Sequence, residues 1–600
     1  MAGSTFRLLA TALGLGLASP AHALDRLEFR VTGGNPEVER AIRGASALAA
    51  IEDQKAAAAQ DVFGAARTEY GRLVTALYGL GYYSPVVNVL VDGREAAQIP
   101  PLDAPATIRR IEVRVEVGPP FRFGLARVAP LAPKTRLPEG FHTGAPAKSG
   151  LVQEAARTAA EGWRAAGHAK VGIARETITA DHAARALDAD IALAPGPRLR
   201  FGPLRVTGEQ RMREDRIRKI AAFPTGKPYD PELLQDSADR LRRSGVFRSV
   251  VLTEDAGVTP PDLLGVTATL VEEKRRRYSF GAEVSSLEGA AVTAEWLHRN
   301  LMGGGERLTV SGAISNIGAA DSGTDYTLGV TLERPATPVA NTSLALGIKV
   351  ERLDEEDYLA DTAAISATLS RYVNKRISGS LGLGYTYSDV TDDNGAYVYE
   401  YVSVPLTVTR DARDDKLNAR KGTYLSAAVT PFAGFGDTGS GGQVKLDGRA
   451  FTSFGDSGAV VLAGRVQAGA VFGPDLIETP RDFLFYSGGG GTVRGQPYQS
   501  LGVRPDASDA DYKIGGTQFA GLSAEIRAPL TRSIGLVAFA DAGWINADQS
   551  VWDRDDWQAG AGLGLRYDTG VGPIRLDVAT PVGGDTGDGV QIYVGIGQAF

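Results

Sequence analysis

Residues 276–600 alternate apolar and polar positions with a period of two, in one segment after another. Residues 343–351 show the pattern clearly, because one face carries Leu344, Leu346, Ile348 and Val350 and the other carries small or charged residues. A period of two predicts a β-strand with two unlike faces. The second half of the chain is therefore predicted to be almost purely β. Soluble sandwiches also alternate, so this pattern alone does not separate a soluble fold from a membrane fold.

The number and length of the segments favour a membrane barrel. The predicted strands cover residues 278–287, 290–298, 306–315, 325–334, 343–352, 363–373, 376–390, 397–410, 422–433, 443–454, 459–472, 518–530, 534–545, 557–568, 573–581 and 589–600. An even number of strands of about ten residues is typical of outer-membrane barrels. Closing the sheet also removes the exposed strand edges. The prediction is a membrane β-barrel of sixteen antiparallel strands over 276–600.

The N-terminus has the pattern of a secretory signal peptide over residues 1–23. Arg7 supplies a positive start, residues 8–18 are apolar, and Ala21-His22-Ala23 fits cleavage between small residues. The mature chain would then begin at Leu24 or Asp25. A buried hydrophobic helix is the alternative. The rest of the sequence has no apolar run of about eighteen residues, the length a membrane-spanning helix needs.

Residues 25–275 mix helical and strand patterns and contain a repeat. Gly118 and Gly196 open two similar segments, and Gly167 and Gly245 follow two similar helices; both pairs lie 78 residues apart. Gly81 has the same role in a looser third copy. A fixed period over two landmarks indicates repeated structural units. We predict three α+β domains, over residues 25–103, 104–194 and 195–275, each with strand, helix, helix, strand, strand. The alternative is three unrelated domains with coincidental glycines.

Several motifs resemble the BamA/TamA superfamily of outer-membrane assembly factors. They are "LGYYSP" (80–85), "NLMGGGERL" (300–308), "RDARDDKLNARKG" (410–422) and the final "GVQIYVGIGQAF". The resemblance covers nearly the whole mature chain and implies periplasmic POTRA domains before a sixteen-stranded barrel. Three such domains are similar to TamA, the outer-membrane subunit of the translocation and assembly module. That branch implies an outer-membrane location in a Gram-negative bacterium.

The connection of about 45 residues before the twelfth predicted strand has a length that is usually functional. It contains Val493-Arg494-Gly495, which matches the Val-Arg-Gly-aromatic motif of the family's sixth extracellular loop, a loop that folds back into the barrel. Gln496 replaces the aromatic residue, and Tyr498 is the nearest aromatic side chain that could take its place.

Alternation places the side chains of Glu525 and Asp541 in the lumen. A guanidinium keeps its charge and needs acceptors. We therefore expect Arg494 to pair with both acids and anchor the loop, as the resemblance also implies. In the alternative, the two acids pair with Arg527, Arg566 or Arg575, which also point inward.

The resemblance implies a factor that folds or inserts outer-membrane proteins, autotransporters among them. Its gate would be the seam between the first and last strands, where Gly595 and Gly597 weaken the pairing and Phe600 ends an apolar face. Simple lumen geometry is the other explanation for these glycines. The implied partners are a TamB-like periplasmic protein anchored in the inner membrane, unfolded clients and outer-membrane lipids, and phospholipid traffic is a related function.

Other classes of function have weaker support. The chain has no cysteine and only five histidines, and it lacks G-x-S-x-G, H-E-x-x-H and P-loop motifs. We expect neither an enzyme nor a cofactor or metal. A formal charge of −7 gives no reason to expect nucleic-acid binding. A two-partner secretion transporter that exports one passenger remains the alternative function, although no plug helix is evident before the first domain.

Overall fold

The structure is a computed structural model that describes residues 24–52, 58–285, 289–319, 322–355, 357–455, 459–504, 513–531, 533–547, 557–570, 572–587 and 589–600. The predicted signal peptide lies outside the described residues. Within these ranges no helix combines the length and the apolar character needed to cross a membrane.

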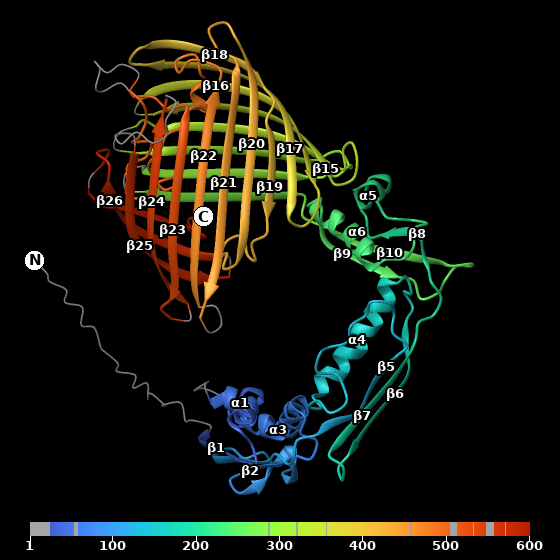
Figure 1. Ribbon diagram of the computed structural model, residues 1–600. Helices are drawn as coiled ribbons and strands as arrows, with labels where there is room; N and C mark the ends of the chain where they lie inside the picture. Colours follow the sequence, from blue (N-terminus) through green and yellow to red (C-terminus); the bar gives the residue numbers. More distant parts are fainter. Residues whose placement is uncertain are drawn as a thin grey trace, which may run out of the picture. The chain divides into compact units, whose positions relative to one another are not determined.

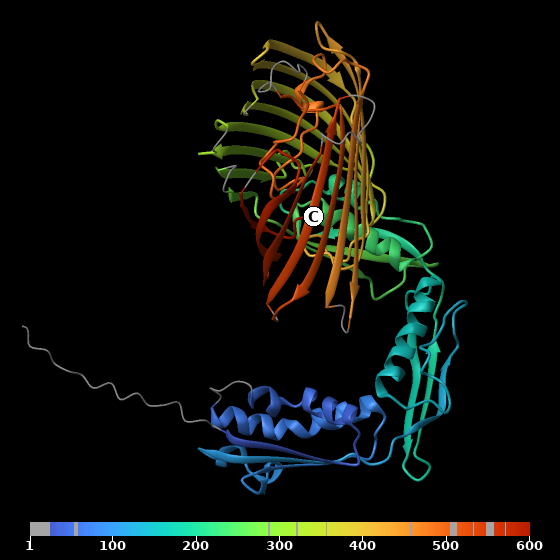
Figure 2. The ribbon, with the colours of Figure 1, turned by 60° about the vertical axis from the view of Figure 1, so that its left-hand side comes forward.

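The first domain is a four-stranded sheet with its helices over one face (Figure 2). Its elements are β1 (Leu24–Thr32), α1 (Pro36–Ala45), α2 (Ala47–Glu52), α3 (Ala59–Leu80), β2 (Val86–Val91), β3 (Arg94–Glu95), η1 (Ala96–Gln98), η2 (Pro101–Asp103) and β4 (Ile108–Glu116). The strand order is β1-β4-β2-β3, with β1 and β4 parallel. The core between helices and sheet includes Leu73, Leu77, Ile111 and Val113, each fully buried.

The boundary predicted at residue 104 is wrong. Strand β4 lies between β1 and β2 of the first sheet, so residues 108–116 complete the first domain and do not begin the second. The repeat gave the spacing of the units but carried no information on which strands pair. A strand that pairs with the start of its domain becomes assignable only when the long-range register is known.

The second and third domains each contain a three-stranded sheet. The second comprises β5 (Arg122–Ala129), α4 (Ser149–Ala165), β6 (Gly172–Asp181) and β7 (Ala186–Ala194), in the order β5-β7-β6. It has a single helix among its described elements, where two were predicted. The third comprises β8 (Arg200–Thr207), α5 (Glu214–Ala221), α6 (Pro231–Arg243), β9 (Phe247–Glu254) and β10 (Leu263–Glu272), in the order β8-β10-β9.

Three of the glycines that mark the repeat follow the ends of helices. Gly81, Gly167 and Gly245 have φ angles of 91°, 99° and 70° after α3, α4 and α6. This left-handed conformation is the common way to end a helix and favours glycine. The chain divides into two compact units, and the second holds Pro203–Pro224, Leu234–Asp255 and Gly265–Phe600. Most of the third domain therefore belongs to the same unit as the β half.

The β half is one antiparallel sheet curled into a barrel (Figure 1). Its strands are β11 (Arg276–Ser285), β12 (Gly289–Arg299), β13 (Arg307–Ile317), β14 (Asp325–Pro335), β15 (Thr342–Asp354), β16 (Tyr358–Tyr372), β17 (Ile377–Asp392), β18 (Gly395–Ser403), β19 (Leu406–Asp411), β20 (Gly422–Phe435), β21 (Gly441–Phe454), β22 (Val460–Phe472), β23 (Gln518–Pro529), β24 (Ile534–Asn546), β25 (Trp557–Thr569), β26 (Gly572–Gly583) and β27 (Gln591–Ile596). Strands β18 and β19 both pair with β17 and β20, so they act as one strand interrupted near Pro405.

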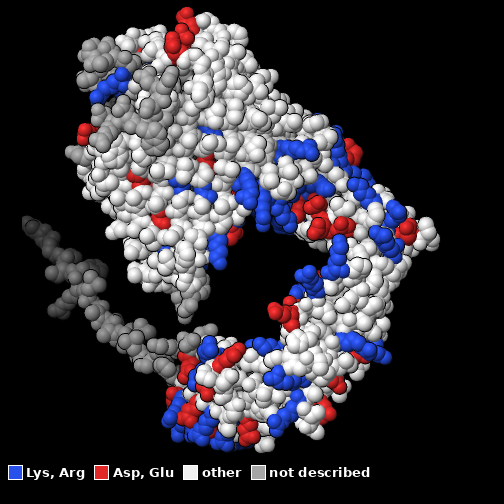
Figure 3. Space-filling model, in the orientation of Figure 1, with Lys and Arg blue, Asp and Glu red and all other residues white. Residues whose placement is uncertain are grey.

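The outer face of the barrel is apolar. Leu346, Ile348, Val466 and Leu563 project outward with 49–59% of their surface exposed. In Figure 3 the visible barrel surface carries few charged residues, whereas charged side chains are dense over the N-terminal domains. An apolar surface of this extent suits contact with lipid rather than water. Among the described residues, the two ends of the sheet meet through one facing pair, Ser285 of β11 and Tyr593 of β27.

The last predicted strand is too long. Residues 589–600 were expected to extend to the final residue with Phe600 on the apolar outer face, but β27 ends at Ile596. Gly597 has φ +93° and turns the chain inward. Phe600 is 7% exposed and packs inside the barrel near Phe451, with ring centroids 6.4 Å apart. Alternation alone did not reveal this turn, because the residue pattern continues past it.

Candidate functional site: a loop anchored inside the barrel

The described parts of the segment between β22 and β23, residues 473–504 and 513–517, fold back along the inside of the barrel. Near its start, the short helix η4 (Arg481–Phe483) is fixed to the wall. Arg481 forms a buried ion pair with Asp392 of β17, and Tyr401 of β18 donates to Asp482 at 2.5 Å. The ring of Phe483 stacks on Phe432 with centroids 4.3 Å apart. These contacts hold the first part of the loop against one side of the barrel.

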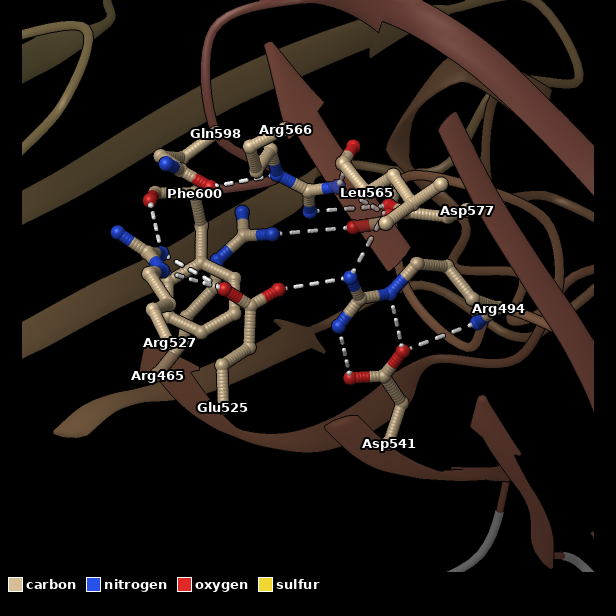
Figure 4. A network of polar contacts seen from close by, with 11 residues as sticks. Arg465, Arg494, Glu525, Arg527, Asp541, Leu565, Arg566, Asp577, Gln598 and Phe600 are labelled. Carbon is tan, nitrogen blue, oxygen red and sulfur yellow. Dashed lines mark hydrogen bonds and ion pairs between the residues drawn. The ribbon is translucent and has the colours of Figure 1, made fainter. Parts of the chain in front are cut away.

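Arg494 lies deeper in the lumen and is 3% exposed. Its Nε and Nη2 donate to the two carboxylate oxygens of Asp541 at 2.7 and 3.0 Å, in the bidentate arrangement of Figure 4. Its Nη1 donates to Glu525 at 2.7 Å. Asp541 is on β24 and Glu525 on β23, and both are buried. The predicted pairing of the loop arginine with these two acids is confirmed.

The network extends beyond the predicted pair (Figure 4). Glu525 also forms an ion pair with Arg527 at 2.7 Å, so the alternative pairing is present as well. Asp577 of β26, which was not predicted, lies 3.5 Å from Arg494 and also forms an ion pair with Arg566 of β25. The signal for Asp577 was present in its alternation, because it shares the lumen face with Arg575.

The positive and negative charges of this network are equal in number, which allows them to be buried together. The arginines are Arg494, Arg527 and Arg566, and the acids are Glu525, Asp541 and Asp577. A buried ion pair with good hydrogen bonds repays much of the penalty of removing charge from water. The network also reaches the end of the chain. Arg566 Nε donates to Gln598 at 2.8 Å, and Arg527 donates to the carbonyl oxygen of Phe600 at 3.2 Å.

The aromatic support for Arg494 comes from a strand. The guanidinium carbon of Arg494 lies 3.6 Å from the ring centroid of Phe539 on β24, a cation–π arrangement. Tyr498, the residue proposed for this role, is 43% exposed, and its hydroxyl accepts a hydrogen bond from Nε2 of its neighbour Gln499 at 2.8 Å. The Tyr498 prediction is therefore wrong. A single sequence motif could not show that the aromatic partner comes from the wall.

Gln496, which stands where the family motif has an aromatic residue, is fully buried. Its Nε2 donates to the carbonyl oxygens of Ala559 at 2.9 Å and Gly583 at 3.0 Å, and its Oε1 accepts from Thr586 at 3.1 Å. The side chain thus joins the loop to the ends of β25 and β26. At the position where the motif has an aromatic residue, this chain thus has a side chain held by three hydrogen bonds.

Glycines on β25 create the space for the loop. A Cβ atom at Gly560 would lie 1.9 Å from the carbonyl oxygen of Arg494, closer than any real contact allows. At Gly564 it would lie 2.1 Å from the carboxylate of Asp577. Glycine at alternate positions of this strand leaves the lumen face open to the loop backbone and to the acids that hold it.

The glycines predicted to weaken the gate, Gly595 and Gly597, are each required by local packing or backbone conformation. The side chain of Arg575 lies over Gly595, at 3.1 Å from the position of an added Cβ, and Gly597 forms the inward turn. Phe600 lies outside β27. The loop itself reaches this strand, because the Gly495 N–H donates to the Tyr593 hydroxyl at 3.1 Å.

The arrangement can position a loop but offers no evident reaction chemistry. Each acid in the network is engaged by an arginine. Among the residues that the structure describes, no group of three or more His, Asp or Glu side chains could hold a metal ion.

Comparisons with known proteins agree with this architecture. The family model described as "Omp85 superfamily domain" matches residues 300–600, and a POTRA model, "Surface antigen variable number repeat", matches residues 199–272. The outer membrane protein assembly factor BamA of Neisseria meningitidis is 24% identical over 404 residues, which cover 62% of this chain and 49% of that protein.

A second relative and a solved structure are similar in the same way. BamA of Neorickettsia risticii is 24% identical over 514 residues, covering 80% of this chain and 64% of that protein. The chain thus spans about half of the first relative's length and less than two thirds of the second's. The structure of BamA from Haemophilus ducreyi lacking POTRA domains 1–3 has a TM-score of 0.63 and 17% identity, and covers 79% of this chain and 100% of that one. This last likeness concerns the fold.

Replacing the loop arginine should release the loop. Removal of one partner from a buried ion pair destabilises a protein by about 3–5 kcal/mol, because the remaining charge is left uncompensated. We expect Arg494→Ala to lower the free energy of unfolding in urea by about this amount and to expose the loop to proteinase K. Arg494→Lys keeps the charge but loses the bidentate geometry, so an intermediate effect is expected. The matched control is Arg504→Ala, at an exposed arginine of the same loop. Unchanged protection in Arg494→Ala would contradict the anchoring role.

Substitutions at Gln496 and Tyr498 should show which of these two side chains holds the loop in its position inside the barrel. Gln496→Leu keeps the volume but leaves buried carbonyl groups without their donor, which costs about 1–3 kcal/mol per unsatisfied group. Tyr498→Phe removes an exposed hydroxyl and should change stability by less than about 0.5 kcal/mol. Urea unfolding of both variants in the same detergent tests the assignment. The reverse order of effects would restore Tyr498 as the support.

The glycine groove can be tested without altering any charged residue. Gly560→Ala should push the Arg494 backbone out of place and expose the loop to protease, although Arg494, Glu525 and Asp541 remain. Gly570→Ala is the control, because a Cβ there meets no atom within 4 Å. If Gly560→Ala leaves the protease pattern and the urea midpoint unchanged, the loop does not require this close approach.

Proposed function

Because the chain belongs to the Omp85 superfamily, we propose that it is an outer-membrane factor that helps β-barrel proteins, autotransporters among them, to fold and insert. Its barrel lies in the outer membrane of a Gram-negative bacterium, and its N-terminal domains lie in the periplasm. We assign all three α+β domains to the POTRA type. The matched region of the third domain and the similar strand–helix–strand order of the other two support this assignment.

The observation that carries the proposal is the seam between β11 and β27. These strands face each other only at Ser285 and Tyr593 within the described residues. By contrast, β11 and β12 pair along their length, from Arg276–His298 to Ser285–Gly289. Among the described residues, the joint between β11 and β27 therefore has a much shorter register than the joint between β11 and β12.

A weak joint in a membrane sheet has a specific physical consequence. In the hydrocarbon region an unpaired backbone group costs several kcal/mol, because no water is present to satisfy it. An incoming client strand can pair with the open edge of β11 and remove this penalty by β-augmentation. Each net hydrogen bond in the existing seam contributes only about 0.5–1.5 kcal/mol. A short seam thus opens easily, whereas a fully paired strand would not.

The periplasmic domains supply docking surfaces in this proposal. The edge strands of their sheets, such as β6 and β9, offer backbone groups to an added strand. We propose a TamB-like periplasmic protein as the partner, unfolded outer-membrane proteins as the clients, and phospholipid traffic as a related task of the same pair.

Affinity purification from cross-linked envelopes should recover a large TamB-like protein. Recovery of a single secreted passenger would instead favour a dedicated transporter.

A cysteine pair across the seam tests the gate directly, because the natural chain has no cysteine. Ser285→Cys with Tyr593→Cys places the two thiols at the one facing pair. The oxidised protein, reconstituted in liposomes, should lose its acceleration of the folding of a urea-unfolded barrel client, and reduction should restore it. Protease protection of the client reports insertion.

The matched control is Ala294→Cys with Gly312→Cys, a facing pair on β12 and β13. Its oxidation should leave activity intact, since no opening is proposed there. Full activity of the oxidised seam variant would rule out lateral opening. If the cysteine-free chain does not accelerate client folding at all, the proposed function itself is wrong.

A further inference from the structure

A second polar site lies away from the loop, within the compact unit that contains the strands. A hollow of about 340 Å³ is bounded by α6 on one side and by the starts or ends of β15, β16, β17 and β19 on the other. Its volume is within the range of small-molecule sites, which begin at about 300 Å³. It is also too large for a single small ion.

One wall of the hollow is a row of hydroxyl side chains. The register of the strands places four of them opposite one another, on β15, β16, β17 and β19 respectively: Ser343, Ser370, Ser380 and Thr407. Ser378 and Thr409 form a second facing pair next to this row. Ser343 is on the face opposite to the outward-pointing Leu344 and Leu346. The row is therefore on the inner face of the barrel and not on the lipid face.

The other wall supplies positive charge. Arg243 of α6 is fixed in place, because it donates to the Asn341 side chain at 3.0 Å and its guanidinium carbon lies 3.7 Å from the ring centroid of Tyr372. Arg240 lines the hollow and donates from Nε to the carbonyl oxygen of Ala221 at 3.3 Å. Arg371 of β16 approaches from the strand side.

These arginines differ from those around the loop in one decisive respect. None of the residues lining the hollow is acidic, and neither Arg240 nor Arg371 has an acidic side chain within ion-pair distance among the described residues. Burial lowers the pKa of Arg240, the charge of Asp236 acts in the opposite direction, and the charge of Arg243 adds to the lowering. Three guanidinium groups thus meet at a hollow whose own lining residues supply no negative charge, and Asp236 acts on Arg240 from outside that lining.

We propose that this hollow binds a phosphate group carried on a small polar organic group, the chemistry shared by soluble phosphate esters and phospholipid headgroups. Guanidinium groups match phosphate oxygens through paired, charge-assisted hydrogen bonds. The hydroxyl row can donate to the remaining oxygens or receive a glycerol-like portion. The inference does not depend on the assembly function proposed above, and no described residue of the loop lines the hollow.

Occupancy of the site would have a structural effect. Its walls come from the third N-terminal domain and from the barrel strands, so a bound phosphate would bridge α6 and β16. The ligand would add an attraction between two elements whose like charges otherwise repel.

The test uses the full chain in a neutral detergent and sn-glycerol 3-phosphate as the probe, with binding measured by isothermal titration calorimetry. Arg240→Gln and Arg371→Gln should each weaken binding by about tenfold or more, the range for losing one charge-assisted hydrogen bond. Arg371 is exposed, so its replacement should leave folding intact even if Arg240→Gln does not fold. Arg248→Gln, at an exposed arginine of β9 outside the hollow, is the control and should bind as the unaltered chain does.

Two further arms identify the source of the phosphate. Inorganic phosphate alone tests whether the organic portion contributes, and nanodiscs of phosphatidylglycerol or phosphatidylcholine test for a lipid headgroup. If phosphatidylglycerol nanodiscs displace glycerol 3-phosphate from the unaltered chain, and direct binding of the same nanodiscs is weakened in Arg371→Gln, the hollow accepts a lipid headgroup. Absence of binding by glycerol 3-phosphate, phosphate and phosphatidylglycerol would overturn the proposal, and so would equal loss in Arg248→Gln.

Discussion

The guanidinium group of Arg494 cannot lose its charge and is buried inside the barrel, so the strands around it must supply negative charge. Arg494 requires acids, and β23, β24 and β26 each place a carboxylate within 3.5 Å of its guanidinium group. Those acids need further positive charge, which Arg527 and Arg566 provide. An unpaired charge in this environment would cost several kcal/mol, so the loop has a well-defined bound position rather than a range of loose ones.

Strand β27 is paired differently on its two sides, one toward the network around Arg494 and the other toward the seam. Strand β27 stays attached to β26, and the residues after it are tied to the network through Gln598 and Phe600. The weak joint is on the other side of β27, toward β11. Separation of β11 from β27 therefore leaves every ion pair of Arg494 in place. The fixed loop is therefore compatible with the proposed opening of the seam, because the contacts of the loop join the late strands to one another and do not involve β11.

Much of this architecture could be predicted from the sequence, since it depends on local periodicity. The alternation of apolar and polar residues predicted nearly every barrel strand, and it correctly predicted that the side chains of Glu525 and Asp541 point into the lumen. The errors have a different origin. The pairing of β4 with β1 and the stacking of Phe539 under Arg494 join residues far apart in the chain, and no local pattern records such contacts. The inward turn at Gly597 was missed because one left-handed residue ended a strand whose side-chain pattern continued.

Comparison of the two arginine clusters shows how charge balance separates a structural role from a binding role. Around Arg494 the charges cancel within the protein, and added Cβ atoms at Gly560 and Gly564 would collide with the groups already present, so the cluster is complete. Around Arg240, Arg243 and Arg371 the charges do not cancel, and open volume remains beside a row of hydroxyl groups. An anion bound beside these arginines would lower the electrostatic cost of holding like charges together. The balanced charges of the first cluster fit the anchoring role predicted for it, and the composition of the second fits the anion site proposed above.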